Sequence, residues 1–305
     1  MMKHIFSGLI TALITPFKDG ALNHASLERL IKHQSAAGVK AIVIAGSTGE
    51  APSLEFSEYD DLVKSAVRIA SSLEDKMNII AGCTASSTNL SIKLAKIAEE
   101  AGADALMCAT PPYNKPSQEG LFQHFKALHD NSALPIMLYS IPGRTGGDFT
   151  DETILRLASM PRICAIKDCC GDFERPIRIQ KQAPDFIFMC GDDSASLAFN
   201  AQGASGVVSV ASNIFPALVK KVQDLWESGK IAEAIMMQRD LISFYKSLFI
   251  ETNPCPAKYA AYIAGLCEAE VRLPLCEPSL KSKEIIEKEV RELMLKNHLS
   301  MHQQE

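Results

Sequence analysis

The feature that most constrains the fold of this chain is a unit that recurs eight times along it. Each unit has a short apolar segment, then a turn of polar or small residues, then an amphipathic helical pattern. The apolar segments are mostly continuous rather than alternating, as is typical of parallel strands covered on both faces. They read SGLITALITPF, VKAIVIAG, MNIIAGCTA, ADALMCATP, LPIMLYSIP, RICAIKDCC, DFIFMCGDD and SGVVSVASN. Eight strands, each followed by a helix, predict an α/β fold of the closed (β/α)8 type, the TIM barrel.

An open, doubly wound parallel sheet is the alternative that the same alternation of strands and helices allows. No predicted strand leads into a G-x-G-x-x-G turn, the usual mark of that fold. The sequence therefore favours the closed barrel.

The pattern changes at about residue 215, because only helical segments follow. They include KVQDLWESG, AEAIMMQRDLISFYKSLF, CPAKYAAYIAGL and SLKSKEIIEKEVRELML. We interpret the first as part of the eighth barrel helix and the others as an addition to the barrel. The sequence thus predicts a (β/α)8 barrel over residues 1–228 and a small C-terminal helical appendage over residues 229–305.

Composition argues against several classes of protein. The 305 residues include 31 Lys and Arg against 36 Asp and Glu, a formal net charge of −5, and no basic block. A nucleic-acid partner is therefore not expected. The nine cysteines contain no C-x-x-C pair and many lie in apolar runs. We interpret them as buried, reduced thiols rather than as a disulfide framework or a zinc site.

The N-terminal segment MMKHIFSGLITALITPF superficially resembles a signal peptide, because a basic start precedes an apolar stretch. It lacks a persuasive small-x-small cleavage site, and Thr11 and Thr15 interrupt the stretch, so a first β-strand is the better interpretation. No run approaches the roughly 20 apolar residues that span a bilayer. The sequence predicts a cytoplasmic protein with no membrane partner.

In barrels of this type, functional side chains lie at the C-terminal ends of the strands, where they converge on one mouth. Few polar residues occupy those positions. They are Ser47, Thr48, Glu50, Tyr113, Tyr139, Arg144, Lys167, Asp168, Asp192 and Asp193. Any catalytic chemistry is expected among these side chains.

Lys167 is the most informative of them. It follows Ile163 and Ala165 at alternate positions, so the three are expected to face the same side of the strand. If that side is the barrel interior, desolvation lowers the lysine pKa and provides a neutral amine that can attack a ketone. A lysine that extends to solvent at a strand end, or one that pairs with Asp168 outside the barrel, fits the spacing equally well.

Three other features of the mouth also have two interpretations. The phenol of Tyr139 can move protons during imine formation, or it is an ordinary aromatic residue at the rim. The turn AGSTGE offers backbone N–H groups and two hydroxyls to a carboxylate, or it is a tight strand-to-helix connection. Arg144 can clamp a carboxylate, or it pins its own loop.

A metal centre is not expected. Asp192 and Asp193 are adjacent, so on an extended strand end they point to opposite sides, and no His lies nearby. A helix N-cap role for one of them is the better interpretation. His124 and His129 lie on a helical stretch and are expected at the surface. The sequence predicts no metal and no cofactor.

Taken together, these segments resemble the pyruvate-dependent Schiff-base lyase and aldolase family, which includes N-acetylneuraminate lyase and dihydrodipicolinate synthase. The resemblance covers essentially the whole chain, from ITPF through AGSTGE, LYSIPGRTG, AIKDCCG and GDDS to ETNPCPAKY. PPYNKPSQEGL and the Arg of PGRTG, which the sialic-acid lyases lack, are most similar to the dihydrodipicolinate synthase branch. That branch condenses pyruvate with L-aspartate 4-semialdehyde to 4-hydroxy-tetrahydrodipicolinate, on the way to diaminopimelate and lysine.

The resemblance implies the catalytic residues. Lys167 would form the Schiff base with pyruvate, and Tyr139 would transfer protons to and from it. Ser47 and Tyr113 would complete a hydroxyl relay with Tyr139, with Tyr113 reaching in from a neighbouring subunit. The resemblance therefore also implies a homo-oligomer, a tetramer built from tight dimers.

It implies the substrate-binding residues too. Thr48, with the backbone of its turn, would hold the pyruvate carboxylate, and Arg144 the carboxylate of the semialdehyde. Gly191 and Val208 match positions whose backbone lines the site.

The chain departs from the family pattern in three places. Ser47 replaces the usual Thr, which keeps the hydroxyl but loses the methyl group that stiffens the rotamer, so we expect activity with a looser relay. Asp168 replaces the usual Glu without an expected effect. In the pocket where lysine inhibits some members, the positions that are His, His, Asn, Glu and Tyr read Phe56, Tyr59, Ser86, Leu90 and Pro112. Without the carboxylate at position 90, a lysine ammonium loses a charged hydrogen bond typically worth about 1.5–3 kcal/mol, so free lysine is expected to inhibit weakly or not at all.

Two alternative functions remain. The first is another pyruvate-dependent aldolase or lyase of the family that acts on a sugar acid, against which Arg144 and the NKPSQEGL segment argue. The second is a catalytically silent barrel that serves as a binding protein. The presence of Lys167, Tyr139, Tyr113 and Arg144 together argues against it, because no packing requirement calls for all four.

Overall fold

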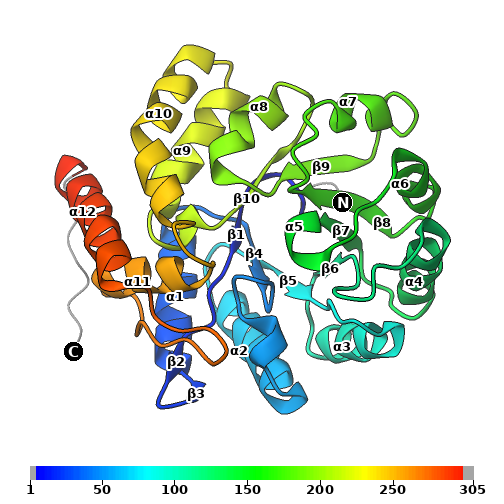
Figure 1. Ribbon diagram of the computed structural model, residues 1–305, viewed down its shortest axis with the longest axis horizontal. Coiled ribbons are helices and arrows are strands. Elements are labelled where there is room, and N and C mark those ends of the chain that lie inside the picture. Colours follow the sequence, from blue (N-terminus) through cyan, green and yellow to red (C-terminus); the bar gives the residue numbers. More distant parts are fainter. Residues whose placement is uncertain (1–4, 298–305) are drawn as a thin grey trace.

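A closed barrel of eight parallel strands is at the centre of the molecule in the computed structural model, which describes residues 5–297 (Figure 1). Around the barrel the strands lie in the order β1-β10-β9-β8-β7-β6-β5-β4. Their bounds are β1 (Gly8–Ala12), β4 (Ala41–Ile44), β5 (Asn78–Gly82), β6 (Ala105–Ala109), β7 (Ile136–Ser140), β8 (Ile163–Asp168), β9 (Ile187–Cys190) and β10 (Gly206–Ser209). Each strand lies within one of the eight predicted segments, so the prediction of a TIM barrel is confirmed.

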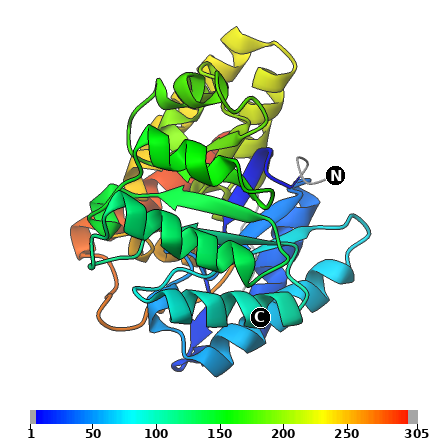
Figure 2. The ribbon, with the colours of Figure 1, turned by 90° about the vertical axis from the view of Figure 1, so that its right-hand side faces the viewer.

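A ring of helices covers the outside of the barrel. Figure 2 shows three of them, α3, α4 and α6, side by side over the strands. The ring consists of α1 (His24–Ala36), α2 (Phe56–Ser71), α3 (Thr88–Glu100), α4 (Gln118–Asp130), α6 (Asp151–Ala158), α7 (Arg175–Gln180), α8 (Ser196–Asn200) and α9 (Pro216–Glu227). The short helix α5 (Pro142–Thr145) is additional and follows β7.

Three further helices follow α9: α10 (Ile231–Ser247), α11 (Cys255–Ile263) and α12 (Leu280–Lys296). Helix α10 packs against α9 and α12, and α11 packs against α12, so the three form a group beside the barrel (Figure 1). Residues 1–4 and 298–305, the outer ends of the two predicted domains, lie outside the described residues. The smaller elements are the hairpin of β2 (Phe17–Lys18) and β3 (Ala21–Leu22) and the 3-10 turns η2 (Ala51–Ser53), η3 (Asp193–Ala195) and η4 (Ala211–Asn213).

Two apolar clusters explain why the strand segments are continuously apolar. One cluster fills the barrel interior and includes Val43, Met107 and Val208. The other lies between the strands and the helices and includes Ile42 and Leu106. Because successive side chains of a strand point to opposite faces, residues 42 and 43 enter different clusters, and neither face is left for polar residues.

The cysteines agree with the sequence analysis only in part. All nine cysteines are free thiols, as predicted, but only five of them are buried. Cys164, Cys169 and Cys170 are half-buried and Cys276 is exposed, so the prediction of burial is wrong at Cys276 and holds only in part at the other three. Among the described residues, no helix is long and apolar enough to cross a membrane.

Candidate active site

A cavity of about 370 Å³ opens at the C-terminal ends of the barrel strands. Its walls come from the loops that follow β4 to β7 and from the segments 253–254 and 272–275. Three of the predicted site residues, Ser47, Tyr139 and Arg144, line it. A larger groove of about 570 Å³ lies near the opposite ends of β8 and β9 and contains none of the predicted site residues.

Lys167 lies on β8 inside the barrel mouth and is 4% exposed. It is in register with Tyr139 of β7 and Met189 of β9, which both belong to the interior cluster. Its Nζ lies 4.4 Å from the centroid of the Tyr139 ring. The structure therefore places this lysine in the interior, not at a strand end that extends to solvent.

The reasoning that led to this position was partly wrong. Ala165 faces the interior, as Lys167 does, but Ile163 belongs to the outer cluster. The pairing of β7 with β8 shifts register at this point, and Cys164 has no partner in the ladder. The extra residue of such a bulge interrupts the alternation of side chains, so positions two apart no longer share a face.

Burial lowers the pKa of Lys167 from its usual value, because the ammonium form has lost its hydration. The carboxylate of Asp193 opposes this shift, because negative charge nearby favours the ammonium. The lower pKa makes the uncharged, nucleophilic amine more accessible near neutral pH.

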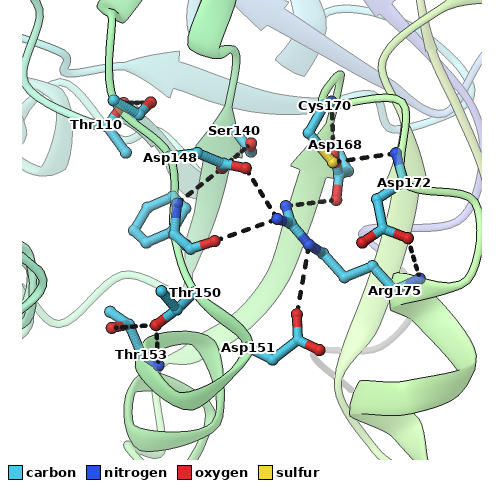
Figure 3. A network of polar contacts seen from close by, with 12 residues as sticks. Thr110, Ser140, Asp148, Thr150, Asp151, Thr153, Asp168, Cys170, Asp172 and Arg175 are labelled. Carbon is cyan, nitrogen blue, oxygen red and sulfur yellow. Dashed lines mark hydrogen bonds and ion pairs between the residues drawn. The ribbon is translucent and has the colours of Figure 1, made fainter.

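Asp168 is engaged elsewhere, as Figure 3 shows. Its carboxylate accepts hydrogen bonds from Arg175 of α7 at 3.2 Å and from the backbone N–H of Cys170 at 2.8 Å. The same guanidinium binds Asp148 at 2.8 Å and lies 3.6 Å from Asp151. The alternative in which Asp168 pairs with Lys167 is therefore wrong, and Asp168 instead ties β8 to α7.

Tyr139 is 4% exposed, and burial raises the pKa of its phenol well above the usual value. The positive charge of Arg144 and the nearby side chain of Ser47 oppose that shift. Tyr139 therefore keeps its proton at neutral pH and lies between Lys167 and a second hydroxyl. This arrangement suits a group that passes protons rather than one that acts as a phenolate.

The turn after β4, residues 46–50, carries Ser47 and Thr48. Ala45 and Glu50, which flank them, have positive φ angles of 49° and 52°, a conformation that non-glycine residues rarely adopt. The Thr48 hydroxyl accepts a hydrogen bond from Asn253 Nδ2 at 2.9 Å. Among the described residues, no acceptor pairs with the backbone N–H groups of Ser47 and Thr48. The turn therefore offers two N–H donors to an anion.

Arg144 and Tyr113 are the exposed members of the predicted set. Arg144 lies on α5, and its Nη2 donates a hydrogen bond to the carbonyl oxygen of Asn253 at 2.8 Å. Tyr113 follows β6, has a φ of 72° and is 92% exposed. Like Lys167 and Thr48, it is not among the residues that line the cavity, but unlike them it extends into solvent in the single chain.

Comparison with known proteins identifies the family. The sequence pattern of the Dihydrodipicolinate synthetase family matches residues 5–293. A 4-hydroxy-tetrahydrodipicolinate synthase of Rickettsia typhi is 48% identical over 296 residues, 97% of this chain and 100% of that protein. The chain belongs to the dihydrodipicolinate synthetase family.

Solved structures of the family agree with the fold. The 4-hydroxy-tetrahydrodipicolinate synthase from Methylacidiphilum fumariolicum SolV has a TM-score of 0.91 at 38% identity, over 96% of this chain and 98% of that one. The chloride-inhibited dihydrodipicolinate synthase from Acinetobacter baumannii, in complex with pyruvate, has a TM-score of 0.90 at 36% identity, over 94% and 98%. Membership of the dihydrodipicolinate synthetase family gives the chain the family reaction, that of a Schiff-base lyase with 4-hydroxy-tetrahydrodipicolinate synthase activity.

Gly191 and Val208 match backbone positions of the family site, and the structure places Gly191 directly against Lys167. A Cβ atom at Gly191 would lie 2.9 Å from Lys167 Cε and 2.1 Å from Cys169 Sγ, so only glycine fits there. Val208 is completely buried in the interior cluster.

Sequence reasoning missed Asn253, which the structure brings to both Thr48 and Arg144. Its only signal was its place in the family segment ETNPCPAKY. The N-cap interpretation holds for Asp192, whose side chain accepts from the backbone N–H of Ser194 at 2.8 Å. Asp193 is instead buried and accepts from the backbone N–H groups of residues 210 and 211.

The expectation that His124 and His129 lie at the surface is wrong. They are 4% and 8% exposed on α4. His124 Nδ1 lies 3.0 Å from the Thr88 hydroxyl and its Nε2 lies 3.8 Å from Cys108 Sγ. The helical pattern could not show that these two positions face neighbouring elements.

Proposed function

We propose that the chain binds pyruvate as a Schiff base on Lys167 and condenses it with L-aspartate 4-semialdehyde to give 4-hydroxy-tetrahydrodipicolinate. The observation that carries this proposal is the position of Lys167, a buried amine beside Tyr139 at the mouth of the barrel. A desolvated, neutral amine adds to a ketone, whereas an ammonium does not.

The amine of Lys167 attacks C2 of pyruvate, and the former carbonyl oxygen takes up protons and leaves as water. Tyr139, with the side chain of Ser47 nearby, supplies and removes these protons. The imine then loses a proton from C3 to give an enamine. The enamine carbon attacks the aldehyde, a carbon–carbon bond forms, and the aldehyde oxygen becomes a hydroxyl. Finally the amino group of the semialdehyde attacks C2 and displaces Lys167 as the ring closes.

Two carboxylates require two binding sites. Thr48 and the free N–H groups of its turn hold the carboxylate of pyruvate, and Arg144 at the cavity wall holds that of the semialdehyde. The backbone at Gly191 and Val208 lines the remaining side. We assign the barrel to residues 1–228 and the appendage to residues 229–305, in a cytoplasmic enzyme.

The test of the function is reduction with borohydride in the presence of pyruvate. The chain is expected to gain the mass of a reduced pyruvyl group on the peptide that contains Lys167, and a coupled assay is expected to favour aspartate semialdehyde over sugar-derived aldehydes. A protein without an adduct would be a silent barrel. Preference for a sugar-derived aldehyde would support the alternative lyase.

The rate of trapping is expected to rise with pH and to reach half its maximum below pH 10.5, the ordinary pKa of lysine. The reason is that burial lowers the pKa of Lys167, so the neutral amine forms at lower pH than on an exposed lysine. Cys169 still holds its proton in that range, because burial raises its pKa to about 11. The measurement is the initial rate of adduct formation with borohydride in excess. A midpoint at or above pH 10.5 would show that the amine is not desolvated.

Tyr113→Phe is expected to leave the melting temperature unchanged and to lower kcat by about 10²-fold or more, the range of a lost proton-transfer group. Tyr113 is 92% exposed, so its hydroxyl does not stabilise the isolated chain; we propose that it completes the relay of a neighbouring subunit in a tetramer of tight dimers. The matched control is Tyr262→Phe, at another exposed tyrosine, which should have the kcat and melting temperature of the wild type. Wild-type turnover by Tyr113→Phe would show that no relay crosses an interface.

Free lysine at millimolar concentration is expected to leave the steady-state rate nearly unchanged. Leu90 lies 41% exposed on α3, where inhibited family members have a carboxylate, and Lys93 Nζ lies 3.7 Å above the ring of Phe56. The local charge therefore opposes a second ammonium. Half-inhibition at millimolar lysine would contradict this expectation, and Leu90→Glu should increase the sensitivity.

A further inference from the structure

The ion pair between Glu50 and Lys258 is completely buried, since neither side chain is more than 1% exposed. Glu50 ends the turn that carries Ser47 and Thr48, and Lys258 lies on α11 of the appendage. The mechanism above uses neither charge. An apolar pair of similar volume is often as stable as a buried ion pair, so stability alone does not explain why charges are here.

The contacts of the pair join four segments of the chain. Lys258 Nζ donates a hydrogen bond to the carbonyl oxygen of Glu270 at 2.7 Å and lies 4.1 Å above the ring of Phe17. Glu50 Oε2 accepts a hydrogen bond from the backbone N–H of Arg272 at 2.9 Å. The carboxylate thus links the site turn to α11 and to the loop between α11 and α12.

Asn253 places the same part of the appendage against the substrate-binding groups. It lies five residues before Lys258, donates to the Thr48 hydroxyl and accepts from Arg144. Asn253 is 5% exposed, lines the cavity, and its Oδ1 has no hydrogen-bond partner among the described residues. The segment 253–258 therefore contacts the site turn at Thr48 and at Glu50, and it also contacts Arg144.

We propose that Glu50 and Lys258 are positioning residues whose buried ion pair holds the turn of Ser47 and Thr48 in place for the pyruvate carboxylate. The proposal rests on the function proposed above. Few other hydrogen bonds hold the turn. Within it, Glu50 N–H donates to the carbonyl oxygen of Ser47 at 3.2 Å. From outside it, the Thr15 hydroxyl donates to the carbonyl oxygen of Gly49 at 2.7 Å. Without the ion pair, the turn and Asn253 are free to separate, and pyruvate loses a hydrogen bond.

The test compares pyruvate half-saturation of borohydride trapping, which needs no second substrate, in the wild type and in the double variant Glu50→Gln/Lys258→Met. The double variant leaves no buried charge without a partner, so it is expected to fold. We expect the half-saturating concentration to rise about tenfold, the value of one hydrogen bond, with little change in the rate at saturating pyruvate.

A second variant keeps the proposal testable if the double variant Glu50→Gln/Lys258→Met does not fold. Glu50→Asp keeps both charges, but its shorter side chain cannot reach Lys258 and the backbone of Arg272 unless the turn moves. The half-saturating concentration is therefore expected to rise in this variant as well. A rise in either folded variant supports the proposal.

The matched control is Ile286→Ala, because Ile286 is fully buried in α12, which packs on α11, and it carries none of the polar contacts of the ion pair. It weakens the same appendage and should leave pyruvate half-saturation unchanged. Wild-type half-saturation in the folded Glu50 and Lys258 variants would overturn the proposal. The proposal would also be overturned if Ile286→Ala, at the same loss of melting temperature, raised the half-saturating pyruvate concentration as much as the Glu50 and Lys258 variants do. A wild type that forms no adduct would remove the proposed function, and this inference with it.

Discussion

Lys167→Met is expected to abolish both the borohydride-trapped adduct and the condensation reaction. The thioether of methionine has nearly the length of the lysine side chain, but it cannot form a bond with C2 of pyruvate. The fold should persist, because position 167 is 4% exposed in an apolar barrel interior that suits methionine. Burial lowers the pKa of Lys167 in the folded chain, so the folded state is disfavoured wherever the unfolded lysine is charged. At pH 7 the variant should therefore melt at the same or a higher temperature.

The matched control is Lys40→Met, because Lys40 is an exposed lysine that pairs with Asp75 at 2.7 Å. It should trap pyruvate and turn over as the wild type does. If Lys167→Met retained turnover, or if its adduct mapped to another peptide, a different amine would carry the chemistry. Mass spectrometry of the reduced peptides decides between these outcomes.

The barrel and the position of its site followed from the sequence because both depend on local pattern. Continuous apolar segments at regular spacing require strands covered on both faces, and eight of them close a barrel. Once the barrel is given, its topology places the ends of the strands at one mouth. Ser47, Tyr139 and Lys167 could therefore be gathered at one site although they are distant in the chain.

What the sequence did not reveal depends on contacts between distant segments. Asn253 and Thr48 are 205 positions apart, and no local pattern marks their hydrogen bond. The same holds for Glu50 and Lys258, whose burial depends on the packing of α11 against the site turn. The bulge at Cys164 is a local irregularity, but periodicity assumes regular pairing and therefore placed Ile163 on the wrong face.

Tyr139→Phe is expected to lower kcat by about 10²- to 10⁴-fold, the usual value of a group that transfers protons in the transition state. The phenol retains its proton at neutral pH because burial raises its pKa. Phenylalanine keeps the ring beside Lys167, so the barrel wall and the environment of the amine should change little. Trapping with pyruvate should slow but still label Lys167, because the nucleophile is intact.

The control is Tyr245→Phe, which removes another buried hydroxyl, 2% exposed on α10, and should leave kcat unchanged. The relay itself is tested by combining Tyr139→Phe with Ser47→Ala. If the two hydroxyls act as one unit, kcat of the double variant should be little lower than kcat of the less active single variant. If they act independently, the two fold-reductions in kcat should multiply. Fold-reductions that multiply would mean that Ser47 contributes to the reaction independently of Tyr139. Ser47 would then not belong to the proton path through Tyr139.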